Sequence, residues 1–356
     1  MATQYARTRC IERLELLGES DLPLDDLRRE AVAELRRAVG FERWCVTSVD
    51  PDTHLPNRGF GEHAPGFAAE FPWLLVHDSA MGDVNNRIVL ARSRNRVGIL
   101  SAATAGEPER CRRYVQTYDR YGIGDEMRTM VADEAGTWGI VELFRDDDQP
   151  NFDEADAQLM RQASLALARV WRRGAIGPAD STECAPAETG VLLLGDDLRP
   201  RSSTGAARQW FAALNPPQVP FPHAAPTPVW SAVGRLLAAE RGEDPEIPAR
   251  VRVRAGDGSW GVVEAARLDG ADGGIAVSLH PASSGDVLGL LGRAYGLSAR
   301  ERELVGLLVE GLDTKEIAER LFISRYTVQD HCKSVFEKVG VNSRRELVSG
   351  VFSQAA

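Results

Sequence analysis

The hydrophobic pattern of the N-terminal half predicts helices at both ends of a set of strands. Residues 22–40 carry apolar side chains three and four positions apart and end at Gly40, which is typical of an amphipathic helix. A second amphipathic helix is predicted after the capping residue Asp153, because the same spacing of apolar side chains continues as far as Trp171. Between these helices we expect strands at 44–49, 97–101 and 138–144, a loop at 50–65 and a helix at 111–121. This order predicts an α+β domain.

A second α+β pattern lies farther along the chain. Apolar residues alternate with arginines over 251–255, the chain turns at 256–258, and 260–265 returns, which predicts a β-hairpin. Arg252 and Arg254 are expected on the solvated face of that sheet. Further elements are expected as strands at 191–194 and 275–279 and helices at 205–214 and 230–239. Small and polar residues before them predict a linker.

The last sixty or so residues predict four short helices, each with its own capping residue. The spacings Ser298 to Glu301, Asp313 to Glu316 and Ser343 to Glu346 are those of capping boxes. Ser324 caps the remaining helix, and Thr327 stands at its third position. A short break at 322–324 separates the second helix from the third. A helix, a tight turn and a second helix form the plan of a helix-turn-helix DNA-binding domain.

This C-terminal segment resembles the DNA-binding domain of LuxR/NarL-type transcription regulators. The residues that carry the resemblance are LSARERE (297–303), KEIAERL (315–321), TVQDH (327–331), KSVFEKVGV (333–341) and SRREL (343–347). The match is continuous, needs no gap and covers about one sixth of the chain. Asp330 and Cys332 depart from it, where a neutral or apolar residue and an aliphatic one are more usual. The resemblance implies binding to double-stranded DNA, with the last helix, 344–352, pairing with its twin in a homodimer.

The third helix is expected to lie in the major groove with its N-terminal half foremost. Its outward positions are Arg325, Tyr326, Gln329, Asp330 and Lys333. We expect Gln329 to form hydrogen bonds with adenine and Lys333 to donate to guanine or a phosphate. Asp330 is suited to accept from the amino group of cytosine. The expected phosphate contacts are Lys315, Thr327, Lys338 and Arg344. The plainer alternative is a helical bundle with an ordinary solvated, charged face.

The rest of the chain resembles two sensor modules. The segments LRRAVGFERWCV, YGIGDEMRTMV, WGIVELFRD and FDEADAQLMRQ are similar to a GAF domain, and the second α+β region resembles a PAS domain. The implied organisation is a GAF-like domain at 20–175, a linker at 176–187, a PAS-like domain at 188–283 and the helix-turn-helix domain at 290–352. The resemblance implies a small-molecule effector. Candidate pocket residues are Trp44, Trp73, Tyr121 and Trp138, although such aromatics are more often plain core.

Composition restricts this picture. The chain has 356 residues, a net charge of −10 and no apolar stretch that approaches twenty residues, so we expect several domains and no membrane span. The first residues lack the apolar centre of a signal peptide, which predicts a cytoplasmic protein. The acidic bulk requires a local attractive surface, weak binding by a single copy and therefore a dimer. The five cysteines are isolated, so we expect no metal site and no disulfide framework. No cofactor is expected.

Three alternatives remain open. A phosphorylated receiver is suggested only by VLLLGDD, which ends at Asp197 and is followed by a Pro-rich loop and a hairpin in place of βα repeats. An enzyme is disfavoured because no GxSxG, P-loop, HExxH or strand-linked GxGxxG motif is present. A non-enzymatic interaction protein is the third, with the helical domain bound to protein. The apolar helix at 287–295 is either a signalling or dimer helix or packs on its own domain.

Overall fold

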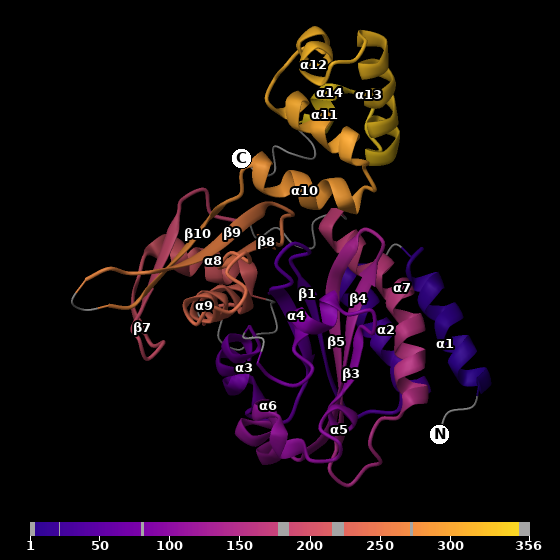
Figure 1. The fold of residues 1–356 in the computed structure, drawn as a ribbon, viewed down its shortest axis with the longest axis vertical. Coiled ribbons are helices and arrows are strands. Elements are labelled where there is room, and N and C mark those ends of the chain that lie inside the picture. Colours follow the sequence, from indigo (N-terminus) through magenta and orange to yellow (C-terminus); the bar gives the residue numbers. More distant parts are fainter. Residues whose placement is uncertain are drawn as a thin grey trace.

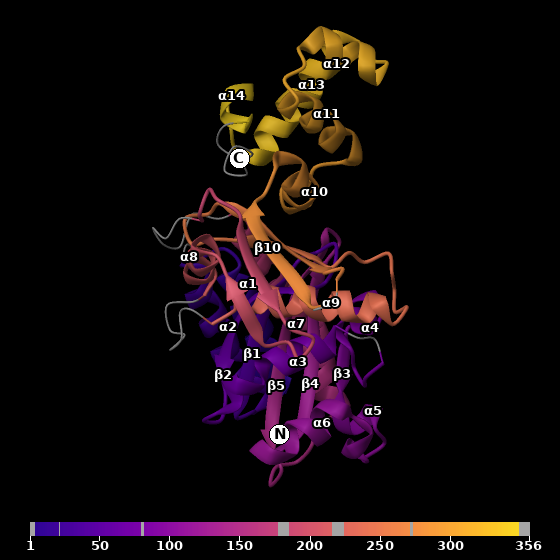
Figure 2. The same ribbon diagram turned by 90° about the vertical axis from the view of Figure 1, so that its left-hand side faces the viewer.

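A computed structural model describes residues 4–20, 22–79, 82–176, 185–215, 224–270 and 273–348. Two α+β domains, each built on a five-stranded antiparallel sheet, lie to one side of a connecting helix, and a helical domain lies beyond it (Figure 1). The turned view shows the same order, with the helical domain at one end of the molecule (Figure 2). The expected multidomain fold class, α+β domains followed by an all-α domain, is confirmed.

The first domain has the strand order β2-β1-β5-β4-β3. Its strands are β1 (Arg43–Val49), β2 (Pro56–Glu62), β3 (Val97–Ile99), β4 (Ile123–Asp133) and β5 (Gly136–Asp146). Alternate side chains of a strand point to opposite faces. Trp44 and Val46 therefore join one core cluster and Cys45 joins another.

Long helices cover the first of these faces and short ones the second. The long helices are α1 (Gln4–Leu17), α2 (Leu24–Val39) and α7 (Glu154–Ile176). The short ones are η1 (Phe67–Glu70), α3 (Phe71–Asp78), α4 (Arg87–Arg92), α5 (Leu100–Ala103), η2 (Pro108–Arg110), α6 (Arg112–Gln116) and η3 (Tyr118–Tyr121). Helix α1 precedes the expected domain start at residue 20, and its Cys10 and Leu14 are buried in the same core as α2 and α7.

Three local expectations for this domain were wrong. Strand β2 pairs with β1 inside the segment expected to be a loop at 50–65. The helix expected at 111–121 is broken at Thr117 into α6 and η3. Strand β4 was not expected, because charged side chains interrupt its apolar alternation; the structure buries Asp125, Glu126 and Arg128 in ion pairs and hydrogen bonds.

The second domain repeats this plan. Its elements are β6 (Gly190–Leu194), β7 (Pro200–Ser203), α8 (Gly205–Leu214), α9 (Thr227–Glu240), β8 (Arg250–Arg254), β9 (Trp260–Arg267) and β10 (Ile275–Pro281). The strand order β7-β6-β10-β9-β8 equals that of the first domain when strands are counted within each domain. The expected hairpin is confirmed, since Arg254 pairs with Trp260 across the turn. Most of the expected linker, 177–184, lies outside the described residues.

The connecting helix is α10 (Ser284–Ala294), and the helical domain beyond it consists of α11 (Ala299–Val309), α12 (Thr314–Leu321), α13 (Arg325–Val339) and α14 (Arg344–Glu346). Its core is continuous with the second domain, because Leu290 and Leu291 of α10 join a cluster that includes Trp260 and Val262 of β9. Helix α10 is thus packed against the second α+β domain as well as against the helical domain. Of the last helix, expected at 344–352, residues 349–352 lie outside the described part.

The two α+β domains share a closely packed interface. Leu55 of the first domain is buried in the core of the second. Helix α9 approaches α3 so closely that a Cβ on Gly234 would lie 2.6 Å from the Cα of Val76. Arg252 was expected on a solvated face, but it is only 7% exposed because the first domain covers it, and Asp50 accepts from its Nε at 2.9 Å. The expectation for Arg252 was therefore wrong.

Candidate nucleic-acid interface

Helix α12 is held at both ends by local hydrogen bonds. The Asp313 carboxylate accepts from the N–H groups of Lys315 (2.7 Å) and Glu316 (2.9 Å), and Glu316 accepts from the Asp313 N–H at 2.7 Å. This is the expected capping box, in which side chain and backbone satisfy each other. The helix ends at Phe322, which has the left-handed φ of 54° and is 93% exposed.

Helix α13 begins directly after this turn. Ser324 accepts from the Thr327 N–H at 3.0 Å, as expected for its cap. Val328 and Val335 are buried against α11 and α12. Between the start of α13 and Lys333, the exposed positions are Arg325, Tyr326, Gln329, Asp330 and Lys333. The helix therefore presents one polar, partly cationic face to solvent.

Among the other expected contact residues, Lys315 is exposed, and the side chains of Thr327, Lys338 and Arg344 have partners within the domain. The Nζ of Lys338 lies 2.7 and 2.9 Å from the carboxylate oxygens of Glu301. The guanidinium of Arg344 donates to the carbonyl oxygens of Leu308, at 2.9 Å, and Leu312. The Oγ1 of Thr327 lies 2.9 Å from Ser324 Oγ. Lys338 and Arg344 thus tie α13 and α14 to the rest of the bundle.

Glu301, the partner of Lys338, is buried, with an exposed fraction of 4%. Burial opposes its ionisation, but hydrogen bonds from Lys338, the Ser298 N–H and Ser334 outweigh that effect and lower its pKa to about 2. The capping box with Ser298 was expected, whereas the link to Lys338 was not. At Ser343 the box is incomplete, because Glu346 accepts from the Asn342 N–H in place of the Ser343 N–H.

The four aromatic residues expected to line an effector pocket do not meet. Trp44 and Trp138 belong to the core on the long-helix face, where their ring N–H groups donate to Glu62 (3.0 Å) and Asp133 (2.9 Å). Trp73 and Tyr121 pack on the opposite face. A single pocket formed by all four is therefore excluded, because the sheet separates the two pairs.

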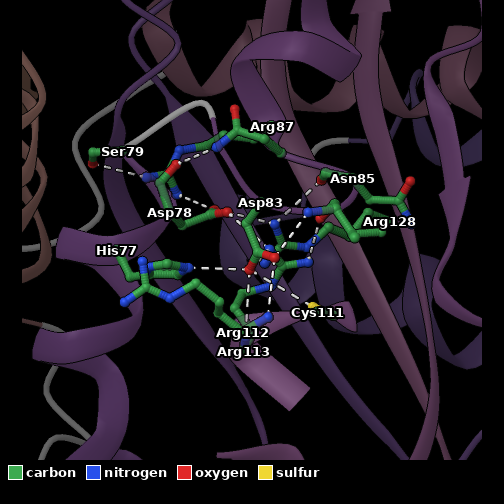
Figure 3. A network of polar contacts seen from close by, with 12 residues as sticks. His77, Asp78, Ser79, Asp83, Asn85, Arg87, Cys111, Arg112, Arg113 and Arg128 are labelled. Carbon is green, nitrogen blue, oxygen red and sulfur yellow. Dashed lines mark hydrogen bonds and ion pairs between the residues drawn. The ribbon is translucent and has the colours of Figure 1, made fainter. Parts of the chain in front are cut away.

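The short-helix face holds a buried network of arginines and carboxylates that was not expected (Figure 3). Arg113, which is fully buried, donates to Asp83 and Glu126 at 3.0 Å each. Arg128 of β4 donates to Asp78 at 2.7 Å and Glu126 at 2.9 Å. The sequence signal was the run of charges in an otherwise strand-like segment at 125–128.

These contacts decide the charge states in the network. Burial would raise the pKa of Asp78, but the neighbouring guanidinium groups of Arg128, Arg87 and Arg113 outweigh it and hold the pKa below its ordinary value. The pKa of Asp83 is also lowered: burial opposes this, and a hydrogen bond from His77 and the charge of Arg113 prevail. Because these arginines are already paired with carboxylates, we interpret the network as one that stabilises the fold of the first domain.

The features above define a helix-turn-helix domain, in which two capped helices are joined by a tight turn and the second is exposed along one side. Residues 296–351 match the family described as bacterial regulatory proteins, luxR family. The chain therefore belongs to this family.

Several regulators share this domain. The spore germination protein GerE of Bacillus subtilis is 48% identical over 52 residues, which are 15% of this chain and 70% of that protein. The monoamine regulon transcriptional regulator of Klebsiella aerogenes is 47% identical over 60 residues, 17% and 26% of the two chains. HTH-type transcriptional regulators of Mycobacterium bovis and Mycobacterium tuberculosis are 49% identical over 57 residues, which are 16% of this chain but only 6% of theirs.

Solved structures show weaker similarity. A GAF domain/HD domain protein from Geobacter sulfurreducens is 16% identical, with 43% of this chain and 95% of that chain covered and a TM-score of 0.32. Escherichia coli SdiA is 10% identical over 97% of this chain and 98% of its own, with a TM-score of 0.35. At such TM-scores neither similarity carries an argument about function, and the names GAF-like and PAS-like rest on the sequence resemblance.

Among the residues that the structure describes, no group of His, Cys, Asp and Glu is placed to hold a metal ion. No helix in the described ranges has both the length and the apolar surface needed to span a bilayer.

Proposed function

We propose that this protein is a sequence-specific DNA-binding transcription regulator in which α13 enters the major groove. The observation that supports this most is the two-sided character of α13. Val328 and Val335 anchor the helix in the core, while its first half exposes side chains with hydrogen-bonding groups. A helix anchored in this way keeps those groups at fixed positions, which reading base edges requires.

Each exposed residue has a chemical role in the proposal. Gln329 pairs with adenine, Lys333 with guanine or a phosphate, and Asp330 accepts from a cytosine amino group. Lys315 lies in the first turn of α12 and Arg325 is the first residue of α13, and both are proposed to contact phosphates. Lys338 has a carboxylate partner within the domain, so we assign it to positioning α13.

A homodimer is the proposed binding form. Residues 296–352 contain nine basic and nine acidic side chains, so a single copy has little net attraction for DNA. Two copies on two half-sites double the number of contacts and fix the half-site spacing. We propose that the protein acts on DNA in the cytosol.

The test uses DNA fragments selected from genomic DNA by the intact protein. Replacing Gln329 and Lys333 by alanine should weaken binding to the selected site by at least tenfold, because each good base contact contributes about 1–3 kcal/mol. The variant K333A should also reduce the slope of log K against log salt by about 1 if Lys333 contacts a phosphate. Binding is measured by fluorescence anisotropy over a salt series.

A matched control carries R37A and R110A, which remove two exposed arginines of the first domain. It should bind the selected DNA like the parent protein. If the Gln329 and Lys333 variant retained full affinity and specificity, α13 would not be the reading helix. Failure of the parent protein to select any sequence would favour the alternative, in which the helical domain binds protein.

Effector control is the second part of the proposal. Helix α10 is packed between β9 and α11, so a change in the sensor domains has a direct route to the DNA-binding helices. The PAS-like or GAF-like domain would bind the effector and change how two copies present α13. Residues 290–356 and the intact chain should then bind the selected DNA with different affinities. Equal affinity under every condition would refute the coupling.

A further inference from the structure

Among the described residues of the helical domain, two large apolar side chains are exposed. Phe322 is 93% exposed and Tyr326 is 73% exposed. A single exposed aromatic side chain does not by itself indicate a binding site, because such residues are common on protein surfaces. The two differ in their place in the domain. Phe322 belongs to the turn before α13, whereas Tyr326 is the second residue of α13, the helix proposed to enter the major groove.

Tyr326 lies on the exposed face of α13 together with the residues proposed to contact bases. Gln329, Asp330 and Lys333 follow it by three, four and seven residues, and these spacings place side chains on one face of an α-helix. The buried residues of the helix, which anchor it in the core, lie on its opposite side. Tyr326 therefore points away from the domain in the same direction as its three polar neighbours.

The side chains on this face are available to a partner. Within the described part of the chain, no hydrogen bond or ion pair engages the side chains of Tyr326, Gln329 or Lys333. The polar groups of Gln329 and Lys333 are well solvated in water, but the tyrosine ring keeps apolar surface in water that a contact would remove. Tyr326 thus supplies the apolar group of a face that is otherwise polar.

We propose that the ring of Tyr326 packs against the 5-methyl group of a thymine in the major groove, so that the protein selects thymine at one position of each half-site. Thymine is the base that presents an apolar group in the major groove, and apolar side chains distinguish it by contact with that methyl group. The polar neighbours of Tyr326 read hydrogen-bonding groups and do not make this distinction. The inference rests on the proposed function, because it requires α13 to lie in the groove.

The helix restricts where that thymine lies. Tyr326 and Gln329 are three residues apart, which is roughly 4.5 Å along the helix axis. Successive base pairs are about 3.4 Å apart. The thymine should therefore lie within about two base pairs of the position whose specificity depends on Gln329.

The test replaces the thymines of the selected DNA site by deoxyuridine one at a time, which removes only the methyl group. The affinities of the intact parent protein and of the variant Y326A for each DNA are measured by fluorescence anisotropy. At one position in each half-site, the replacement should weaken binding by the parent protein about fourfold, because the contact with one methyl group is lost. It should leave binding by Y326A unchanged. The variant Y326F keeps the ring and should respond like the parent protein.

The matched control is Y5A, which removes a tyrosine of α1 with nearly the same exposure, 74%, and should respond like the parent protein. Equal responses of the parent protein and Y326A at every thymine, or a selected site without thymine near the Gln329 position, would overturn the inference while DNA binding itself stood. Loss of the response in Y326F would assign the contact to the hydroxyl group and would also overturn it. If the parent protein selected no DNA sequence, the proposed function would fail as well.

Discussion

Single side chains in this protein combine local and long-range roles, and Glu301 is the clearest case. It accepts from the Ser298 N–H at 2.6 Å, which completes a cap three residues away. It also accepts from Ser334 at 2.7 Å and pairs with Lys338 of α13, 37 positions along the chain. The cap is evident from spacing alone, whereas the pairing depends on how α11 packs on α13. The same pairing explains why Lys338, expected at a phosphate, is engaged within the domain.

The variant E301Q is expected to destabilise the helical domain by about 2 kcal/mol at pH 7, because it removes a charge from a buried hydrogen-bonded pair. The folded-state pKa of Glu301 is lowered from its ordinary value of 4.5 to about 2. Its contribution is therefore complete above pH 4.5 and is lost as the pH falls from 4.5 to 2. Hydrogen exchange of the α11 and α13 amides measures the effect.

The control for that measurement is E303Q, which changes a carboxylate on the same helix that is 55% exposed. It should leave exchange nearly unchanged, since exposed pairs contribute little. A destabilisation by E301Q that persisted undiminished at pH 2 would contradict the assignment of the effect to the ionised carboxylate.

At the scale of elements, capping and turn chemistry shape the helix-turn-helix unit. The three residues at 322–324 carry the chain from α12 to α13, and Phe322 takes the left-handed conformation that glycine usually supplies at a helix end. A side chain with a Cβ pays roughly 1–2 kcal/mol for that conformation. Burial of the Phe322 ring does not offset this conformational cost, because the side chain is 93% exposed.

Replacing Phe322 by glycine should therefore stabilise the turn, by roughly 0.5–1 kcal/mol after the larger entropy of a glycine-containing unfolded chain is subtracted. Alanine is the matched control, since F322A removes the ring but keeps the Cβ and should give no gain from backbone relief. Hydrogen exchange of the α12 and α13 amides distinguishes the two. Equal stabilisation by both variants would show that the exposed ring, not the backbone, was the source of the cost.

At the scale of the whole molecule, one charged junction connects all three parts. Asp50, only 2% exposed, binds Arg252 of β8. Asp52, two positions on, pairs with Arg252 and with Arg293 of α10. Arg252 also donates to the Asp286 carbonyl at the start of α10, at 3.0 Å. The loop after β1 thus contacts both the second domain and α10, the helix that leads to α11, α12 and α13.

The variant D50N should loosen this junction, because it leaves a buried arginine without its main charge partner, a change that costs about 3–5 kcal/mol in typical cases. Amide exchange should rise in β8 and α10 together, while the first sheet stays protected. D148N, in an exposed turn of the first domain, is the control and should change neither. Faster exchange in β8 with unchanged α10 would contradict a junction that links both.

The amino-acid sequence was sufficient to predict the helix-turn-helix domain, the order of two α+β domains before it and the hairpin at 251–265. These features depend on capping, turns and periodicity, whose physical causes act over a few neighbouring residues. The positions and partners of the buried charged side chains became apparent from the three-dimensional packing. Arg252 meets Asp50 across 202 positions, and β4 carries charges that packing buries. Whether a charged side chain is buried, and with which partner it pairs, depends on which surfaces pack together. That packing involves residues far apart in the chain, so it cannot be predicted from the neighbouring sequence.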